Sequence, residues 1–149
     1  MLATFPDYRV MCQRSVASGN ATGKFGNDVY SVEFLAPVNG TVEPLSLDAL
    51  RTKPFGTQYS FSLGDAVQNC EESVVYLPAV DEVAREKGMR LAAVQNLGDF
   101  VRQHCASGDY DDLLVQMSCL GKWGESVSVA EWEVVQFYCV ATFCWADAE

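Results

Sequence analysis

Two adjacent carboxylates, Glu71 and Glu72, lie near the middle of a stretch that is otherwise rich in strand formers and apolar residues, 53–80. Ionised side chains are rarely buried without a partner, so one interpretation is a pair of solvated loop acids. The other is that a carboxylate here accepts hydrogen bonds from a ligand that offers N–H donors, because an ionised carboxylate can only accept. The residue types alone leave both interpretations open.

The other residues that often carry chemistry show no recognisable pattern. The six cysteines form no C-x-x-C pair and the chain has one histidine, His104, so no plausible set of zinc ligands exists and we expect no metal site. No dinucleotide-binding G-x-G-x-x-G, P-loop, nucleophile elbow or H-E-x-x-H motif occurs. We expect most of the cysteines to be buried reduced thiols, and His104 to be a core residue on an apolar helix face.

The charge balance limits the ways in which the chain could bind RNA. Its 149 residues, enough for one domain, carry 10 Lys and Arg against 20 Asp and Glu, a formal net charge of −10. Binding through phosphates alone normally requires a basic patch, and the cations here are scattered. An RNA would therefore have to be recognised locally or with help from other residues. No stretch approaches the roughly 20 apolar residues that cross a bilayer, so we expect no membrane association.

The elements that must position these residues alternate between strands and helices, which predicts an α/β fold. Turn residues and apolar periodicity predict strands at residues 1–6, 28–36, 57–67 and 89–95 and in the second half of 134–145. Helices are predicted at residues 7–16, from Pro78 to Gly88, from Asn96 to His104, at 113–120 and after Ser128.

Two local patterns make further predictions. Ser128 and Glu131 have the spacing of a capping box, in which each side chain satisfies a free N–H group at the start of a helix. The last strand, within FYCVATFCW, is too apolar for an exposed sheet edge, so we expect it at the centre of a sheet and buried on both faces. The predicted strands do not complete a sheet, and we expect the sheet to continue in residues beyond those given.

Four blocks of the sequence share their order and approximate spacing with one known family. This family shows FGN-x-x-Y-x-v-x-F, then FG-x-x-Y-x-F-x-L with an acidic segment, then EWE followed by Tyr and an apolar strand, and it has T-x-P-(N/D) at the end of a strand. The corresponding blocks are FGNDVYSVEF at 25–34, FGTQYSFSLGDAVQNCEESVV at 55–75, AEWEVVQFYCVATF at 130–143 and ATFPD at 3–7. The chain resembles the C-terminal half of the eukaryotic mRNA cap guanine-N7 methyltransferases. The resemblance implies the C-terminal half of a class I (Rossmann-like) methyltransferase sheet with flanking helices.

The resemblance also assigns roles to three residues. Glu72 matches the glutamate that binds the cap guanine, Tyr138 a tyrosine that contacts the cap, and Pro6 a proline whose ring lies near the guanine. In this family the guanine N7 attacks the methyl group of S-adenosylmethionine directly, so the enzyme mainly aligns the reactants and no catalytic residue is expected. A carboxylate would accept hydrogen bonds from the guanine N1–H and N2–H₂ groups, and aromatic groups would hold the ring.

Alternatives remain for each of these residues. Glu71 stands where the family usually has proline, and Ser73 replaces its following aromatic residue, so a shift of one residue would make Glu71 the guanine acceptor. Tyr138 also fits a core position, Pro6 also fits a simple turn, and both acids also fit a solvated loop. The basic residues Arg9, Arg14 and Lys24 would either reach the triphosphate or transcript or be solvated surface residues.

The resemblance covers only part of a methyltransferase. The family binds S-adenosylmethionine through a D-x-G-C-G-x-G turn in an N-terminal half, and this chain contains no such turn, so we expect no cofactor-binding residue and no methylation by this chain alone. The implied function is the cap-binding part of a nuclear mRNA cap guanine-N7 methyltransferase that acts on 5′-capped (GpppN) RNA, together with the N-terminal half or a capping-enzyme subunit. Two alternatives are a non-catalytic methyltransferase-like partner that stimulates or docks a capping enzyme, and a cap-reading module without chemistry.

Overall fold

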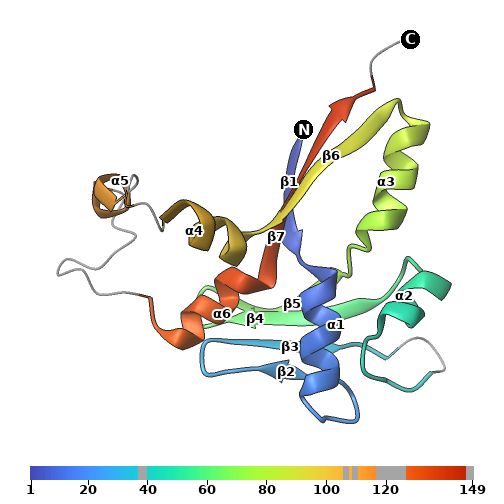
Figure 1. Ribbon diagram of the computed structural model, residues 1–149. Helices are drawn as coiled ribbons and strands as arrows, with labels where there is room; N and C mark the ends of the chain where they lie inside the picture. Colours follow the sequence, from blue (N-terminus) through green and yellow to red (C-terminus); the bar gives the residue numbers. More distant parts are fainter. Residues whose placement is uncertain (37–39, 106–107, 109–110, 117–126, 147–149) are drawn as a thin grey trace.

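Two antiparallel β-sheets and the helices around them make up the structure, a computed structural model that describes residues 1–36, 40–105, 108, 111–116 and 127–146 (Figure 1). The three-stranded sheet has the order β1-β7-β6, with β1 at Leu2–Pro6, β7 at Tyr138–Trp145 and β6 at Met89–Asn96. The four-stranded sheet has the order β2-β3-β4-β5, with strands at Phe25–Gly26, Tyr30–Phe34, Gln58–Leu63 and Val67–Ser73. The helices are α1 (Tyr8–Ala17), α2 (Leu47–Thr52), α3 (Leu77–Glu86), α4 (Leu97–Cys105), α5 (Asp111–Gln116) and α6 (Val129–Phe137).

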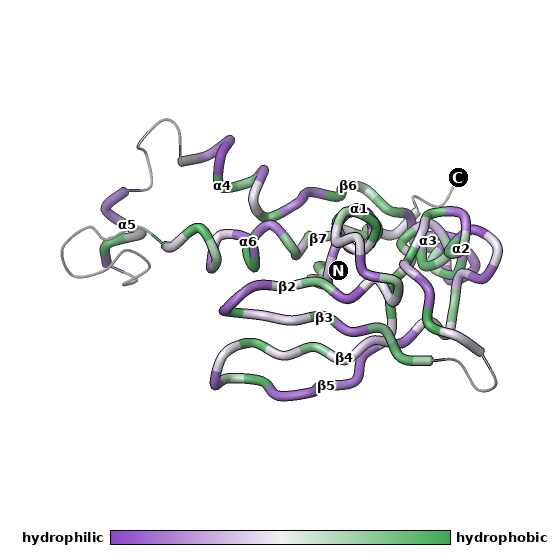
Figure 2. Tube along the Cα trace, turned by 90° about the horizontal axis from the view of Figure 1, so that it is seen from below, coloured by the Kyte–Doolittle hydropathy of each residue, from purple (hydrophilic) through white to green (hydrophobic). Residues whose placement is uncertain are grey.

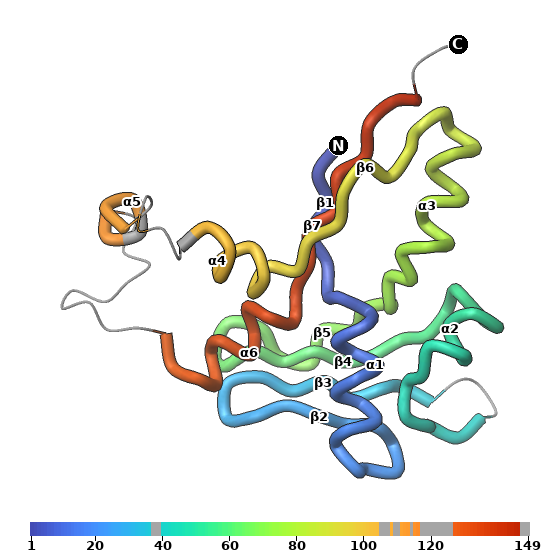
Figure 3. Tube along the Cα trace, viewed as in Figure 1, coloured from blue at the N-terminus to red at the C-terminus, as the bar shows by residue number. Residues whose placement is uncertain are grey.

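The three-stranded sheet brings the two ends of the chain together. Figure 3 shows β1, in blue, beside β7, in red, and the two strands pair antiparallel along their length, from Leu2 opposite Thr142 to Pro6 opposite Tyr138. On its other side β7 pairs with β6. The prediction that the last strand lies at the centre of a sheet is therefore confirmed.

The prediction that β7 is buried on both faces is wrong. Cys139, Ala141 and Phe143 are almost fully buried, whereas the residues between them are only half-buried. Successive side chains of a strand point to opposite faces, so this sheet is fully covered along β7 on one face and only partly covered on the other. Helix α3 contributes Leu77 to that face, where it packs with Ala141 and Phe143.

The main hydrophobic core lies between the four-stranded sheet and helices α1 and α6. Alternate residues of β3 and β4 point toward these helices, and Figure 2 shows both helices on the same side of strands β2–β5. At the centre is Phe137, which is fully buried and has ring contacts to Phe25, Tyr30 and Phe61. Because Phe137 is the last residue of α6, the core fixes the point at which β7 begins.

Local signals placed several helix ends correctly. The capping box of Ser128 and Glu131 is present, with Ser128 N donating to Glu131 Oε2 at 2.8 Å and Glu131 N donating to Ser128 Oγ at 3.2 Å. Helix α3 has Pro78 in its first turn and ends just before Gly88, whose φ of +75° suits glycine. Asn96 accepts a hydrogen bond from Gly98 N at 2.9 Å at the start of α4.

Four elements differ from the sequence-based predictions. The acidic pair lies in strand β5, so the loop interpretation of these residues is wrong. Helix α2 and the short strand β2 lie in segments predicted as connectors. Helix α5 already begins at Asp111, inside the predicted loop 106–112, and residues 117–120 of the predicted helix fall outside the described residues. None of the helices in the described ranges is both long and apolar enough to span a membrane.

Candidate functional site

Glu72 is held by a tyrosine on the neighbouring strand. It lies on β5 directly opposite Tyr59 of β4, and the Tyr59 hydroxyl donates a hydrogen bond to Glu72 Oε2. Tyr59 is only 1% exposed, whereas the Glu72 side chain is half-buried. Burial raises the pKa of Tyr59, and the hydrogen bond and charge of Glu72 raise it further. The phenol therefore stays protonated and acts as a donor to the carboxylate.

Tyr138 approaches the same carboxylate from the three-stranded sheet. It is the first residue of β7, and its ring makes edge contacts with Phe61 at a centroid distance of 6.4 Å and with Phe137 at 5.5 Å. The side chain is half-buried, so it is neither a fully buried core tyrosine nor a surface residue. Burial raises the pKa of Tyr138, and the negative charge of Glu72 adds to this shift. Phe61 lies two residues after Tyr59 on β4 and faces the same side of the sheet, as does Glu72 opposite Tyr59. The ring contact with Phe61 therefore brings Tyr138 to the sheet face on which Glu72 lies.

Pro6 completes this group. It is buried and lies opposite Tyr138 in the register of β1 and β7, where facing residues point to the same side of a sheet. Pro6, Tyr138, Glu72 and Tyr59, which we call the Glu72 site, thus come from both ends of the chain and from the β4–β5 hairpin. The structure brings together all three residues to which the resemblance assigns a role at the cap.

Glu71, the alternative acceptor, points away from this group. Neighbouring residues of a strand face opposite sides of its sheet, and Glu71 lies opposite Ser60 rather than Tyr59. Its side chain is exposed. The geometry therefore favours Glu72 over Glu71 as the carboxylate that a ligand beside Tyr138 would meet.

The resemblance assigns no role to Tyr59, the tyrosine of the FG-x-x-Y-x-F-x-L block, although this residue makes the hydrogen bond that orients Glu72. The alternation of Tyr59, Phe61 and Leu63 showed that Tyr59 faces a core. Its partner depends on the register between β4 and β5, and the polar residues of β5 do not predict a strand.

The basic residues near the N-terminus are already engaged within the protein. Arg9 makes two hydrogen bonds to the buried carboxylate of Asp7, from Nε to Oδ1 at 2.9 Å and from Nη2 to Oδ2 at 2.8 Å. Arg14 donates to the Tyr30 hydroxyl and to the carbonyl oxygen of Glu133, and Lys24 pairs with Glu33 at 2.7 Å.

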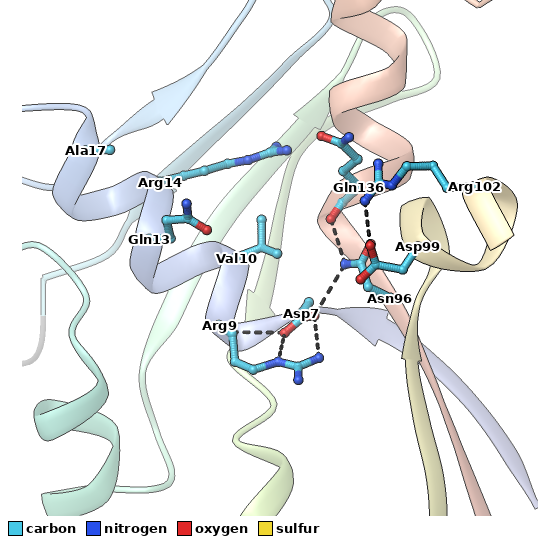
Figure 4. A pocket seen from close by; sticks show the side chains of 10 residues that line it. All are labelled: Asp7, Arg9, Val10, Gln13, Arg14, Ala17, Asn96, Asp99, Arg102 and Gln136. Carbon is cyan, nitrogen blue, oxygen red and sulfur yellow. Dashed lines mark hydrogen bonds and ion pairs between the residues drawn. The ribbon is translucent and has the colours of Figure 1, made fainter.

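A polar cleft of about 460 Å³ lies between α1, α4 and α6 (Figure 4). Asn96 connects two other lining residues, the N-cap residue of α1 and a residue of α6. Its Nδ2 donates to Asp7 Oδ2 at 3.3 Å and to the Gln136 carbonyl oxygen at 2.9 Å. Neither Glu72 nor Tyr138 lines this cleft. It is therefore separate from the Glu72 site.

No cluster of three or more potential metal ligands occurs among the described residues. Cys12 and Cys139 are buried free thiols, as predicted, but Cys70 is exposed on β5 and departs from that expectation.

His104 is half-buried and packs against the ring of Phe100 at 4.4 Å, and Phe100 is itself 44% exposed. The interpretation of His104 as a core residue is therefore wrong.

Comparison with known proteins identifies the family. The sequence-family model described as the mRNA (guanine-N(7))-methyltransferase domain matches residues 1–145. The chain belongs to this family. Its mixed α/β architecture with flanking helices agrees with the Rossmann-like class I methyltransferase fold that the resemblance implied.

Several relatives are named mRNA cap guanine-N(7) methyltransferases. The protein of Drosophila melanogaster is 33% identical over 80% of this chain, that of Oryza sativa subsp. japonica 29% over 92%, and that of Schizosaccharomyces pombe 27% over 96%. The matched segments cover only 25%, 36% and 38% of those proteins, respectively. The chain thus spans well under half of the length of each of these relatives.

Proposed function

We propose that this chain is the C-terminal, cap-binding part of an mRNA cap guanine-N7 methyltransferase domain, and that it holds the terminal guanine of GpppN-ended RNA at the Glu72 site. The observation that carries the proposal is that Tyr138, on one sheet, packs against Phe61 on the face of the other sheet where Tyr59 holds Glu72. A scaffold would have no need to keep a half-buried carboxylate beside an aromatic ring.

The chemistry of the site suits guanine. An ionised carboxylate offers two acceptor oxygens, and the guanine edge offers N1–H and N2–H₂ as two adjacent donors. Adenine presents an acceptor at N1 and would leave the carboxylate without a partner. The ring of Tyr138 and the buried ring of Pro6 would flank the base. Methylation of N7 makes the base cationic, which favours contact with an aromatic face.

In this proposal the methyl donor is S-adenosylmethionine, which supplies an electrophilic methyl group. The sequence has no Gly-rich D-x-G-C-G-x-G turn, and we propose that the N-terminal half binds the donor. We assign no cofactor-binding and no catalytic residue here. The contribution of this chain is to orient the guanine, since N7 is already nucleophilic and needs no general base.

An open sheet edge supports the idea that an N-terminal half completes the domain. In the described structure β1 pairs only with β7, so its other edge has no strand beside it. On the sheet face that α3 does not cover, Leu2 is 73% exposed and Val140 is only half-buried. An apolar face beside an open edge is a site for further sheet and covering helices. We propose that a donor-binding half pairs with this open edge and covers this face. We also propose that the assembled enzyme acts in the nucleus, where transcripts are capped.

Binding of cap analogues tests the proposal. Calorimetric titration of this chain with GpppG and with ApppA should show binding of GpppG and a clear preference over ApppA. Equal affinity for the two dinucleotides, or binding of neither, would rule out the Glu72 site as a guanine site. The second outcome is also what a non-catalytic docking partner predicts.

The enzymatic part of the proposal needs a separate test. The N-terminal portion of the Oryza sativa relative, supplied as a second polypeptide with labelled S-adenosylmethionine, should permit methyl transfer to GpppG only when this chain is present. A cap-reading module without chemistry would bind GpppG and remain inactive in this assay.

A further inference from the structure

Building on the proposed function, we infer that Tyr59 is a positioning residue that sets the guanine specificity of Glu72. The hydroxyl of Tyr59 donates to Glu72 Oε2, and the two residues are direct cross-strand partners of β4 and β5. No other hydrogen bond to the Glu72 side chain is present among the described residues. The orientation of the carboxylate therefore depends on this one donor.

Tyr59 is suited to orient Glu72 because the packing of the core holds its side chain in place. It is 1% exposed and belongs to the main hydrophobic core, together with its strand neighbour Phe61 and with Val74, just beyond the end of β5. Glutamate, by contrast, has three rotatable side-chain bonds, and Glu72 sits on an edge strand of its sheet. A rigid donor therefore selects one orientation of a flexible acceptor, which lowers the entropy that a ligand must remove on binding.

The direction of the hydrogen bond matters for specificity. Because the pKa of Tyr59 is raised, its hydroxyl remains a donor at ordinary pH and Glu72 remains the acceptor. One lone pair of Oε2 is then occupied, while the other lone pair and both lone pairs of Oε1 stay available. Two parallel N–H donors of a guanine fit this arrangement, and the orientation of the carboxylate decides whether both are reached together.

The variant Tyr59→Phe removes only the hydroxyl and leaves the buried ring. We expect the affinity for GpppG to fall about ten-fold or more, as for the loss of a hydrogen bond to a charged group. We also expect the preference for GpppG over IpppG to shrink, because inosine lacks the 2-amino group that a correctly oriented carboxylate would bind. General damage to the fold would weaken both ligands equally and leave this ratio unchanged.

The matched control is Tyr30→Phe, which removes the hydroxyl of another buried tyrosine of the same core, one that bonds Arg14 instead of Glu72. It should leave the ratio of the two affinities at the wild-type value. In a Glu72→Gln background, Tyr59→Phe should cause no further change in that ratio, and this comparison stays valid if either variant is less stable.

The outcomes separate the two proposals. A wild-type chain that does not prefer GpppG over ApppA contradicts the proposed function itself. A wild-type chain that prefers GpppG, together with a Tyr59→Phe variant whose ratio of GpppG to IpppG affinity equals that of the wild type, contradicts only the role of Tyr59.

Discussion

Pro6 and Tyr138 lie directly opposite each other on β1 and β7, although they come from the two ends of the chain. Tyr138 in turn experiences the charge of Glu72, which reaches the site from the β4–β5 hairpin. Three distant segments thus meet where the two sheets adjoin.

Replacing Glu72 with glutamine should weaken binding of GpppG by about 1.5–3 kcal/mol, because a hydrogen bond to a charged acceptor is lost and the amide adds a donor facing the N–H groups of guanine. Calorimetry would measure the change. Glu71→Gln is the matched control, since Glu71 is exposed on the opposite face of β5. A larger effect at Glu71 would show that the acceptor had been misassigned by one residue.

Replacing Tyr138 with leucine should weaken binding of the methylated product analogue m7GpppG more than binding of GpppG. The methylated base is cationic, and contact of a cation with an aromatic face contributes about 0.5–2 kcal/mol. Tyr138→Phe keeps the ring and should retain most of the affinity for both ligands. Equal weakening of the two ligands by Tyr138→Leu would argue against a contact between the ring and the base.

Replacing Gly26 with alanine should destabilise the fold by about 1–3 kcal/mol, measured by urea unfolding. Gly26 has a φ of +150°, and an added Cβ would lie 2.2 Å from the Tyr30 carbonyl oxygen and 2.8 Å from Ser31 Cα. These neighbours are backbone atoms and cannot move aside cheaply.

Gly19→Ala is the control for that experiment. Gly19 also has a positive φ, +64°, but nothing lies within 4 Å of its added Cβ. Its effect should therefore be clearly smaller. Similar losses at both glycines would mean that conformational strain, and not the close approach of β3, decides the cost.

Stability should fall in alkaline solution because of two buried thiols. Burial raises the pKa of Cys12 from 9.0 to about 11 and that of Cys139 from 9.0 to about 12. Above about pH 9 the unfolded chain loses these protons first, so the stabilisation is complete below pH 9 and declines as the pH rises toward the folded-state values. The slope is at most about 1.4 kcal/mol per pH unit for each thiol.

Urea unfolding between pH 8 and pH 11 would measure this decline. Cys139→Ala should make the slope shallower, whereas Cys70→Ala, at an exposed thiol, should leave it unchanged. A slope that is the same in all three proteins would exclude the thiols as its cause.

Short-range features of the fold could be predicted from sequence. The capping box joins Ser128 and Glu131 within the first turn of α6, and it is present. Each end of α3 is likewise marked by a nearby residue, Pro78 in its first turn and Gly88 just after its end. The apolar last strand was placed correctly at the centre of a sheet, because only such a position removes so much apolar surface from water.

Strand β5 shows where local signals were insufficient. Its residues, VQNCEES, are mostly polar and exposed, and Asn, Gln and Glu have little intrinsic preference for strands. The segment is extended because its backbone pairs with β4, and this pairing is a property of the folded chain. The same pairing determines that Glu72, and not Glu71, faces Tyr59.

The order of residue types along the chain determined the α/β class and most helix ends, and the resemblance of four sequence blocks to the family supplied the candidate residues Glu72, Tyr138 and Pro6. The tertiary structure alone decided that β1 pairs with β7, that Tyr138 lies near Glu72, and that Tyr59 orients the carboxylate. Helix caps and apolar periodicity act over a few residues, so the sequence displays them directly. Strand register and the approach of two sheets depend on the packing of a whole core, and therefore only the folded chain reveals them.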